Sequence, residues 1–305
     1  MNKEIGAVIV TFNRMKKLED TLEAFANQTC KPNYIVVVDN CSNDGTAAFL
    51  KKWADIDEGY TKYVITTEHN IGGSGGFYTG LNFAEVLSAD WIWVSDDDAI
   101  PRISAIDEAH KFLQKNDTYL NSISAICGAV VNDGQYDFGH RKTIYSRGVK
   151  SLCENSKQED YSSDFEINAF SYVGTILNKN KLKEVGLPKR DYFIWYDDTE
   201  HSLRLSKVGK IVCIPSIVID HNVPKDNNEI TWKTYYGVRN GLDTMRIHFK
   251  QCFYWAVLKE LIKGLLNELY RHNLYEKIRL DATLDVLRNR FGLHPVYRPG
   301  WKPED

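Results

Sequence analysis

Three consecutive carboxylates, Asp96, Asp97 and Asp98, follow the apolar stretch 91–94. Adjacent carboxylates repel one another, so a place behind a buried strand requires a counter-charge. Residues two apart in an extended segment point to the same side, so Asp96 and Asp98 can converge on one ion. Hard oxygen ligands suit Mg²⁺ or Mn²⁺, which would bridge to the diphosphate of a nucleotide. A solvated acidic turn is the alternative interpretation.

A histidine at the end of a second apolar stretch offers a third ligand. His221 follows residues 211–219 and Asp220. A histidine at a strand end is more often packed or exposed than a ligand. The acidic cluster at the same sheet edge makes neutral imidazole a plausible partner for it. We therefore expect Asp96, Asp98 and His221 to hold Mn²⁺ or Mg²⁺.

A second carboxylate pair, Asp197 and Asp198, follows Trp195 and Tyr196 and precedes a predicted amphipathic helix over 199–208. Aromatic rings pack on the apolar faces of sugars, and carboxylates accept hydroxyl protons. The pattern is typical of a sugar-binding floor with a base above it. Asp is also a favoured N-cap, and Asp198 would lie at or near the N-cap, so a purely structural role stays open.

Four glycines, at 72, 73, 75 and 76, lie in the segment 70–77. Glycines permit positive φ and close approach of the backbone to a ligand. The run also precedes a predicted helix over 75–87, whose N-terminal amides favour anions. It matches neither the Walker A motif nor the dinucleotide fingerprint. A flexible turn explains the run almost as well as a ligand site.

These groups need a scaffold that brings strand ends together. The first hundred residues alternate short apolar runs with helical patterns, which predicts a mostly parallel sheet with helices on both faces. Ligands of such sheets bind beyond the carboxyl ends of the strands. Residues 132–166 are polar without a clear period and are expected to form loops and irregular strands. The predicted strands are 5–10, 34–38, 62–66, 91–94, 169–178 and 211–220, and the predicted helices are 18–27, 45–53, 75–87 and 199–208.

From Thr231 onward the chain is predicted to be mostly helical. The aromatic stripe 232–240 surrounds Arg239, which is expected to pack in a core with a salt bridge or to reach a phosphate. Residues 249–270 are hydrophobic over more than half of the helix circumference, with lysines among them. This helix packs on the catalytic domain or on another subunit, giving a homo-oligomer. Alternatively it attaches peripherally to an anionic bilayer.

Composition narrows the class of protein. The net charge of -3 gives no electrostatic case for a nucleic-acid partner. Six cysteines without a CxxC pair fit reduced thiols better than disulfides or a zinc site. The sequence has no signal-peptide pattern and no apolar run approaching about 18 residues. We therefore expect a cytoplasmic protein, soluble or peripheral at the inner face of the membrane.

Together the motifs resemble glycosyltransferase family 2, and within it most of all the bacterial galactofuranosyltransferases and related rhamnosyltransferases. The resemblance covers about residues 5–245. The matching segments are VTFNR at 10–14, VVDN at 37–40, NIGGSGGF at 70–77, SDDDA at 95–99, FIWYDDTEHSLR at 193–204, IDH at 219–221 and YYGVRN at 235–240.

The resemblance implies an α/β fold of the GT-A type, Rossmann-like, with a helical C-terminal extension. It implies a catalytic domain over 1–228, with a nucleotide-binding half over about 1–100 and an acceptor half over about 101–228, and an extension over 229–305. Asp198 is similar to the family's general base, and Asp96, Asp98 and His221 to its metal ligands. Tyr172-Val173 stands where galactofuranosyltransferases carry a Trp pair. The donor-binding residues implied are Thr11, Phe12, Arg14, Asp39, Asn70, Gly72, Gly73 and Asp97, and the acceptor-binding residues are Tyr172, Trp195 and Asp197.

The activity implied is inverting, metal-dependent transfer of a sugar, galactofuranose from UDP-galactofuranose, to a cell-surface glycan or lipid-linked glycan. A rhamnosyltransferase that uses dTDP-rhamnose is the alternative within the family. Two readings of other classes are a nucleotide-sugar-binding module without catalysis and a nucleotidyltransferase. The second would normally carry a basic, Gly-rich phosphate loop at the first strand, where this chain has TFNRMKK.

Overall fold

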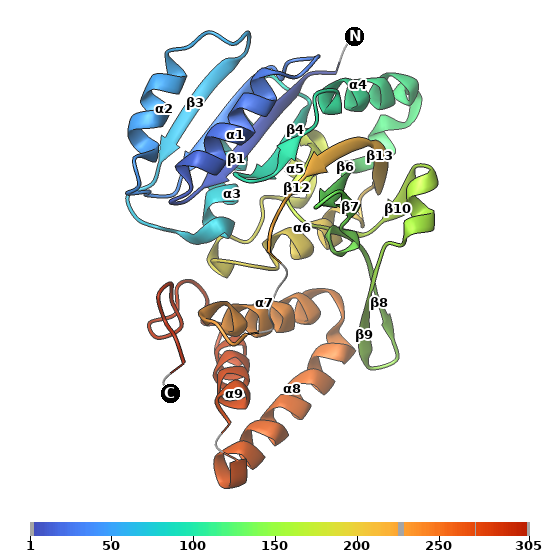
Figure 1. The fold of residues 1–305 in the computed structure, drawn as a ribbon. Coiled ribbons are helices and arrows are strands. Elements are labelled where there is room, and N and C mark those ends of the chain that lie inside the picture. The colour runs from blue at the N-terminus through green and yellow to red at the C-terminus, as the bar shows by residue number, and fades with distance from the viewer. Residues whose placement is uncertain (1–2, 225–228, 272, 304–305) are drawn as a thin grey trace.

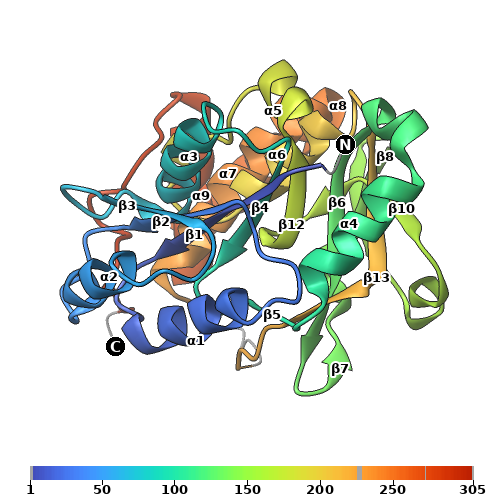
Figure 2. The same ribbon diagram turned by 90° about the horizontal axis from the view of Figure 1, so that it is seen from above.

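The computed structural model describes residues 3–224, 229–271 and 273–303. Its central sheet has the strand order β10–β13–β6–β12–β4–β1–β2–β3 (Figure 1). The short strands β5 and β7 pair with β13 and β6 (Figure 2). The strands are β1 Ile5–Thr11, β2 Tyr34–Asp39, β3 Thr61–Thr66, β4 Trp91–Asp96, β5 Ile100–Pro101, β6 Ile123–Asn132, β7 Gln135–Tyr136, β10 Phe165–Ile167, β12 Val173–Asn178 and β13 Lys210–Asp220.

Helices cover both faces of this sheet, as predicted (Figure 2). One apolar cluster joins the sheet to α1, α2 and α4, and a second joins its other face to α3, α5 and α6. Strands β4, β1, β2 and β3 run parallel, as do β13 and β6, whereas β12 and β10 are antiparallel to their neighbours. The helices are α1 Met15–Ala26, α2 Thr46–Ala54, α3 Gly72–Ala84, α4 Ala105–Lys115, α5 Lys179–Val185 and α6 Asp197–Leu205.

The parallel register brings the polar strand ends to one edge. Thr11 of β1 lies opposite Asp39 of β2, and Val10 lies opposite Asp96 of β4. Side chains just beyond these ends therefore meet although they are far apart in sequence. The predicted gathering of strand-end residues is confirmed.

Helix α3 begins at Gly72, three residues before the predicted start, so the glycine run is helix rather than loop. Only the first glycine of the run has a positive φ, of 76° at Gly72. A Cβ on Gly76 would come within 2.5 Å of the Val10 side chain, and one on Gly80 within 2.4 Å of Val8. These glycines thus let α3 lie directly on β1.

The stretch predicted as loops and irregular strands contains a regular hairpin. Strands β8 (Arg141–Arg147) and β9 (Lys150–Asn155) pair antiparallel, and β11 (Ala169–Phe170) joins them in a second sheet. Most hairpin residues are at least partly exposed on both faces, so the sequence lacks the alternation that marks a half-buried strand. Short helical segments also occur along the chain between its longer elements. They are Asp117–Ser122, Phe138–His140, Gln158–Ser162, Arg190–Tyr192 and Asn267–Arg271.

The C-terminal region is helical, as predicted. Helix α7 (Trp232–His248) packs on α8 (Lys250–Leu266) and α9 (Leu274–Leu287), and the three lie beyond the carboxyl edge of the sheet (Figure 1). The predicted boundary between 228 and 229 falls at residues 225–228, outside the described part of the chain. No helix among the described residues is long and apolar enough to cross a membrane.

Candidate active site

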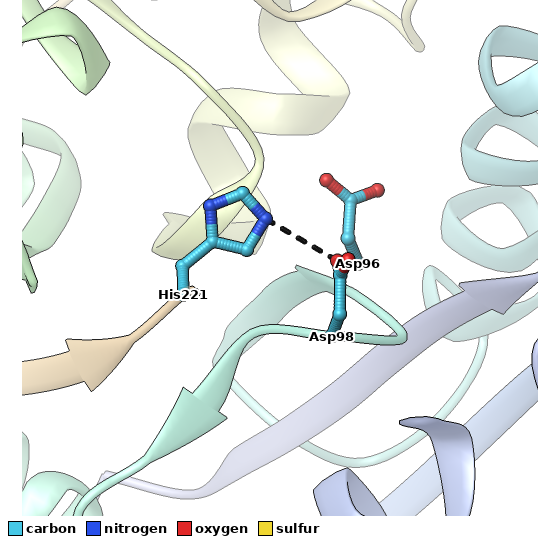
Figure 3. Close-up of side chains that lie close together, drawn as sticks. All are labelled: Asp96, Asp98 and His221. Atoms are coloured by element: carbon cyan, nitrogen blue, oxygen red, sulfur yellow. Dashed lines mark hydrogen bonds and ion pairs between the residues drawn. The ribbon is translucent and has the colours of Figure 1, made fainter. Parts of the chain in front are cut away.

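The predicted metal ligands converge. Asp96 ends β4, Asp98 follows two residues later, and His221 follows β13. Each offers a ligand atom within 4.8 Å of the other two (Figure 3). The Nε2 atom of His221 lies 3.2 Å from Oδ1 of Asp98. Two carboxylates and one imidazole form a donor set suited to Mn²⁺, and its oxygen ligands also suit Mg²⁺. The residues therefore fit a divalent cation.

Unequal protonation of the two carboxyls supports this fit. Burial, followed by repulsion from Asp98, raises the pKa of Asp96 to about 8. Burial would also raise the pKa of Asp98, but hydrogen bonds from His221 and Lys17 and the charge of Arg14 outweigh it and lower that pKa. Without a cation one carboxyl thus keeps a proton near neutral pH, and a bound cation would displace it.

Asp97 points into the protein. Its carboxylate accepts a hydrogen bond from Thr11 Oγ1 at 2.7 Å and from Arg14 Nη1 at 3.2 Å. Arg14 also donates to Asp98 at 2.9 Å, and Lys17 donates to the same oxygen at 2.8 Å. Thr11 and Arg14, expected at the nucleotide, thus hold the acidic cluster here. Lys17 was missed, although the basic run TFNRMKK could have indicated it.

Residues after β2 organise the start of α3. The Asn40 amide donates to Asn70 Oδ1 at 3.1 Å and to the Gly72 carbonyl at 3.0 Å, and Asn70 Oδ1 accepts from the Gly72 amide at 2.8 Å. Asn40 was missed as a site residue, although it directly follows Asp39. Asp39 Oδ2 is buried and has no hydrogen-bond partner among the described residues. Gly73 borders open space.

Phe12 and Trp195 are partly exposed, whereas Tyr172 is buried. The exposed fractions of Phe12 and Trp195 are 36% and 44%. The Tyr172 hydroxyl shares a hydrogen bond with His201 Nδ1 at 2.5 Å, and its ring lies 4.7 Å from that of Phe77. Of the two predicted acceptor aromatics, only Trp195 presents a face to solvent.

The carboxylate pair opens helix α6, which begins at Asp197 rather than at Thr199. The N-cap is Tyr196, with a left-handed φ of 69°, so Asp198 lies inside the first turn and not at the cap. Asp197 is buried and Asp198 is half-buried. Burial, followed by repulsion from Asp198, raises the pKa of Asp197 to about 7, and burial raises the pKa of Asp198.

Two residues of the hairpin region link this pair to the metal ligands. The ring of His140 lies 5.3 Å from that of His221, centroid to centroid. Lys142 and His140 both act on Asp198, where their charges oppose the effect of burial on its pKa. His140 is therefore close to both acidic groups. Sequence reasoning missed His140 and Lys142 because no regular pattern singled out their segment.

The loop before α6 is strained and clamped. Phe193, Trp195 and Tyr196 all have positive φ, which costs about 1–3 kcal/mol each. The buried Asn240 amide donates to the carbonyls of Tyr192, Ile194 and Trp195 at 3.0, 2.9 and 2.9 Å. Helix α7 thus fixes the backbone that carries the two carboxylates.

Arg239 has the same structural role. It is buried and donates to the carbonyls of Asp191, Tyr192 and Gly292. Its guanidinium also lies over the ring of Tyr236, 4.9 Å from the centroid. The idea that Arg239 reaches a phosphate is wrong, because its donors are spent on the protein backbone. Its partners are carbonyls rather than the expected salt bridge.

Replacing Asn240 with Ala is expected to lower kcat at least about tenfold with little change in donor KM. Unclamped carbonyls let the strained loop relax and move Asp198 out of position. Unfolding free energy should fall by about 1–3 kcal/mol. Asn267→Ala is the matched control, because Asn267 is also buried and hydrogen-bonded, but its partner is Asn273 and not the loop before α6. Equal kcat loss in both variants would remove the positioning role.

A comparison with known families identifies the family of this chain. Residues 7–173, more than half of the chain, match the model described as glycosyl transferase family 2. The chain belongs to glycosyltransferase family 2. The prediction of a glycosyltransferase is confirmed, over both a nucleotidyltransferase and a binding module without catalysis.

Three curated glycosyltransferases illustrate the relationship. Galactofuranosyltransferase GlfT1 of Mycolicibacterium smegmatis is 28% identical over 206 residues, which cover 67% of this chain and 66% of that protein. dTDP-rhamnosyl transferase RfbF of Shigella flexneri is 28% identical over 310 residues, covering 96% and 98%. The GalNAc(5)-diNAcBac-PP-undecaprenol beta-1,3-glucosyltransferase of Campylobacter jejuni is 22% identical over 298 residues, covering 92% and 91%.

Solved glycosyltransferases share the fold. GalNAc-T7, crystallised with UDP, GalNAc and Mn²⁺, has a TM-score of 0.66 at 15% identity over 94% of this chain and 56% of its own. TarS of S. aureus in complex with UDP-GlcNAc has a TM-score of 0.57 at 14% identity over 93% and 81%. The predicted GT-A fold of this family 2 glycosyltransferase is confirmed.

Proposed function

We propose that this glycosyltransferase moves a hexofuranosyl or hexosyl group from a nucleoside-diphosphate sugar to an acceptor hydroxyl by one inverting displacement. The observation that carries the proposal is the half-buried Asp198 in the first turn of α6. The charge of His140 acts on it, and the ring of His140 lies 5.3 Å from that of His221 in the Asp96–Asp98–His221 group. The site offers a base and a place for a diphosphate without an activated enzyme nucleophile. A single displacement needs no more than that.

Asp198 is the proposed general base. The acceptor oxygen attacks the anomeric carbon, its proton passes to the Asp198 carboxylate, and the bond from that carbon to the diphosphate oxygen breaks. Burial raises the pKa of Asp198, which brings a carboxylate closer to the proton affinity useful near neutral pH. Asp197, held by the same turn, is proposed to contact the sugars.

The donor lies along the edge formed by β1, β2 and α3. The unpartnered Asp39 Oδ2 would accept a hydrogen bond from the nucleoside, with Phe12 and Asn70 beside it. The open space at Gly73 would admit the diphosphate. A divalent cation held by Asp96, Asp98 and His221 would neutralise charge on the departing diphosphate. Hydrogen bonds hold this edge in shape. Asp97 accepts from Thr11 and Arg14, and Gly72 bonds with Asn40 and Asn70.

One assay tests the proposed function. The protein is incubated with a panel of nucleotide sugars and Mn²⁺, and release of nucleoside diphosphate is followed with and without glycan acceptors. Release from one donor, stimulated by an acceptor, is the expected result. No release from any nucleotide sugar would overturn the proposal.

UDP-galactofuranose is the proposed donor, because the segments NIGGSGGF, DDDA, IDH and YYGVRN resemble those of galactofuranosyltransferases, one of which is a relative of this chain. dTDP-rhamnose is the second candidate, since the rhamnosyl transferase relative matches 96% of the chain, including the C-terminal helices. Galactofuranose carries an exocyclic diol where rhamnose carries a methyl group. The polar groups proposed to bind that diol are Asp97, Asp197 and the amides of α3.

We expect kcat/KM with the same acceptor to favour UDP-galactofuranose over dTDP-rhamnose. Polar groups that bind the diol would be left unpaired by rhamnose, and such mismatches cost up to about 10⁴-fold in discrimination. A diol that faces solvent would give only slight discrimination. The measurement is kcat/KM for both donors. A clear preference for dTDP-rhamnose would replace the proposed sugar and leave the proposed base and metal ligands unchanged.

The acceptor is proposed to be a surface glycan carried on a polyprenyl diphosphate at the cytoplasmic face of the membrane. The name of one relative specifies an undecaprenol-linked glycan with a PP group. The outer face of α8 supports a membrane contact, because it leaves Tyr254, Leu258, Ile262 and Leu265 exposed. Lys250 and Lys259 are also exposed on this helix, and their charges suit anionic lipid.

The protein is expected to float with liposomes that contain anionic phosphatidylglycerol at low salt. Ile262→Glu should reduce the membrane-bound fraction about tenfold. It removes one exposed aliphatic side chain that the bilayer would bury, and it adds a carboxylate that anionic lipid repels. Val86→Glu is the matched control, since Val86 is 80% exposed but lies beside α3. Protein that stays at the bottom of the gradient contradicts the membrane contact. A dimer measured in solution would then assign this face to a homo-oligomer.

A further inference from the structure

A groove of about 1550 Å³ opens beside the loop before α6, which we call the catalytic loop. The β8–β9 hairpin and helices α7, α8 and α9 form its other sides. We call it the C-terminal groove. Trp195 and Tyr196, which directly precede the catalytic carboxylates, line one end of it. Its volume exceeds the range of about 300–1,000 Å³ common for small-molecule sites. An extended ligand can therefore lie in it against Trp195 and Tyr196, three and two residues before Asp198 in the chain.

Its inner end is built for a sugar ring. A Cβ on Gly237 would lie 3.2 Å from the Trp195 ring, and a Cβ on Gly241 would lie 3.0 Å from the Tyr196 ring. The two glycines of α7 thus let both rings approach the helix closely. Asn240 holds the carbonyl of Trp195, so the ring is positioned in advance. A rigid, exposed indole is a suitable floor for the apolar face of a sugar.

Its charge is opposite to that of the chain. Four lysines and one arginine line the groove against two glutamates, whereas the whole chain carries a net charge of -3. Arg279 is neutralised by Glu260 through hydrogen bonds of 2.7 and 2.6 Å. Lys150 of the hairpin and Lys259 of α8 are exposed, and no carboxylate of the described residues lies within ion-pair distance of either. The groove therefore favours an anionic ligand.

An aliphatic surface adjoins these lysines. Trp255 and Lys259, one turn apart on α8, line the groove. Leu258 and Ile262, also one turn apart, belong to the neighbouring exposed stripe of the same helix. Three chemistries thus border one path: an aromatic floor beside the base, cations from two sides, and an apolar helix face.

We propose that the C-terminal groove binds the acceptor through its lipid-proximal diphosphate. Lys150 and Lys259 hold the diphosphate, Trp195 supports the sugar next to Asp198, and the polyprenyl chain lies along the outer face of α8. This inference rests on the proposed function and extends it to the part of the acceptor that the enzyme recognises. It makes an acceptor without the diphosphate a poor substrate.

Farnesyl diphosphate and farnesol are the probes, with binding followed by tryptophan fluorescence in EDTA so that no metal site is available. Lys150→Ala and Lys259→Ala are each expected to weaken farnesyl diphosphate about five- to tenfold and leave farnesol unchanged. Lys250→Ala is the matched control, because Lys250 lies on the same helix outside the groove lining. Excess UDP should not displace the probe.

Each outcome is informative. Equal affinity for farnesyl diphosphate in the three variants, or displacement by UDP, would overturn the groove assignment. Acceptor-independent hydrolysis of the donor is measured separately with the wild-type protein. Hydrolysis that persists while the lysines have no effect rejects only the groove. Absence of hydrolysis for every nucleotide sugar rejects the proposed function instead.

Discussion

Replacing Asp198 with Asn is expected to lower kcat about a thousandfold while the affinity for the donor stays within a few-fold of wild type. The amide keeps the size of the carboxylate and can still accept the hydrogen bonds from Thr199 that anchor it. It cannot take the proton of an acceptor hydroxyl, and general bases contribute about 10²–10⁴-fold. Steady-state transfer kinetics and donor binding by calorimetry measure the two quantities.

The pH profile gives an independent reading of the same variant. Wild-type kcat/KM should rise with pH, because the working form of the Asp197–Asp198 pair is deprotonated. The acid limb should lie above the ordinary carboxyl range, since burial raises the pKa of both groups, that of Asp197 to about 7. The residual kcat/KM of Asp198→Asn should depend much less on pH over this range.

Asp191→Asn serves as the matched control, because Asp191 is an exposed carboxylate shortly before the catalytic loop. It should leave both kcat and the pH profile unchanged. An Asp198→Asn variant that keeps most of its kcat would remove Asp198 from the role of base.

Removing the metal is expected to abolish transfer, and adding Mn²⁺ or Mg²⁺ should restore it. Removing a residue that only orients a metal ligand lowers metal affinity about 10–100-fold. Asp98→Asn removes the charge of a ligand itself, so it should lower metal affinity at least as much. The variant site carries less negative charge and would hold the cation more weakly. Donor binding should weaken too, because the cation would no longer be held where the diphosphate binds. Electron paramagnetic resonance of Mn²⁺ measures the metal affinity apart from any activity.

Asp220→Asn tests whether this effect is specific. Asp220 precedes His221 but pairs with Arg102 at 2.9 Å, outside the Asp96–Asp98–His221 group. Its substitution should leave Mn²⁺ binding within a few-fold of wild type. Full transfer activity in metal-free buffer, together with unaltered Mn²⁺ binding in Asp98→Asn, would refute the metal site.

The chemistry of the acidic cluster could be predicted because it depends on short-range geometry. Asp96 and Asp98 are two residues apart after an apolar strand, so they share one side whatever the rest of the fold does. The alternation of strands and helices likewise predicted a parallel sheet and the edge where strand ends meet. Local pattern was sufficient for both, and the resemblance to family 2 followed from the order of these motifs.

Helix starts and cap positions could not be predicted in the same way. The glycine run was expected to be a loop, but Asn40 and Asn70 hold its first residue and contact with β1 makes it a helix. Asp198 was expected at or near an N-cap, and it lies two residues after the N-cap, which is Tyr196 in a left-handed conformation. The exact start of each helix depends on distant contacts as well as on local propensity.

The sheet, the acidic cluster and the family could thus be read from the residues alone, because these depend on period and on residues that are neighbours in the chain. The partners that surround them are visible only in the folded protein. His221 reaches Asp98 across 123 positions, Asn240 clamps a loop more than forty residues away, and His140 links the base to the metal ligands. Such pairings follow from how strands and helices pack, and no local pattern encodes that packing.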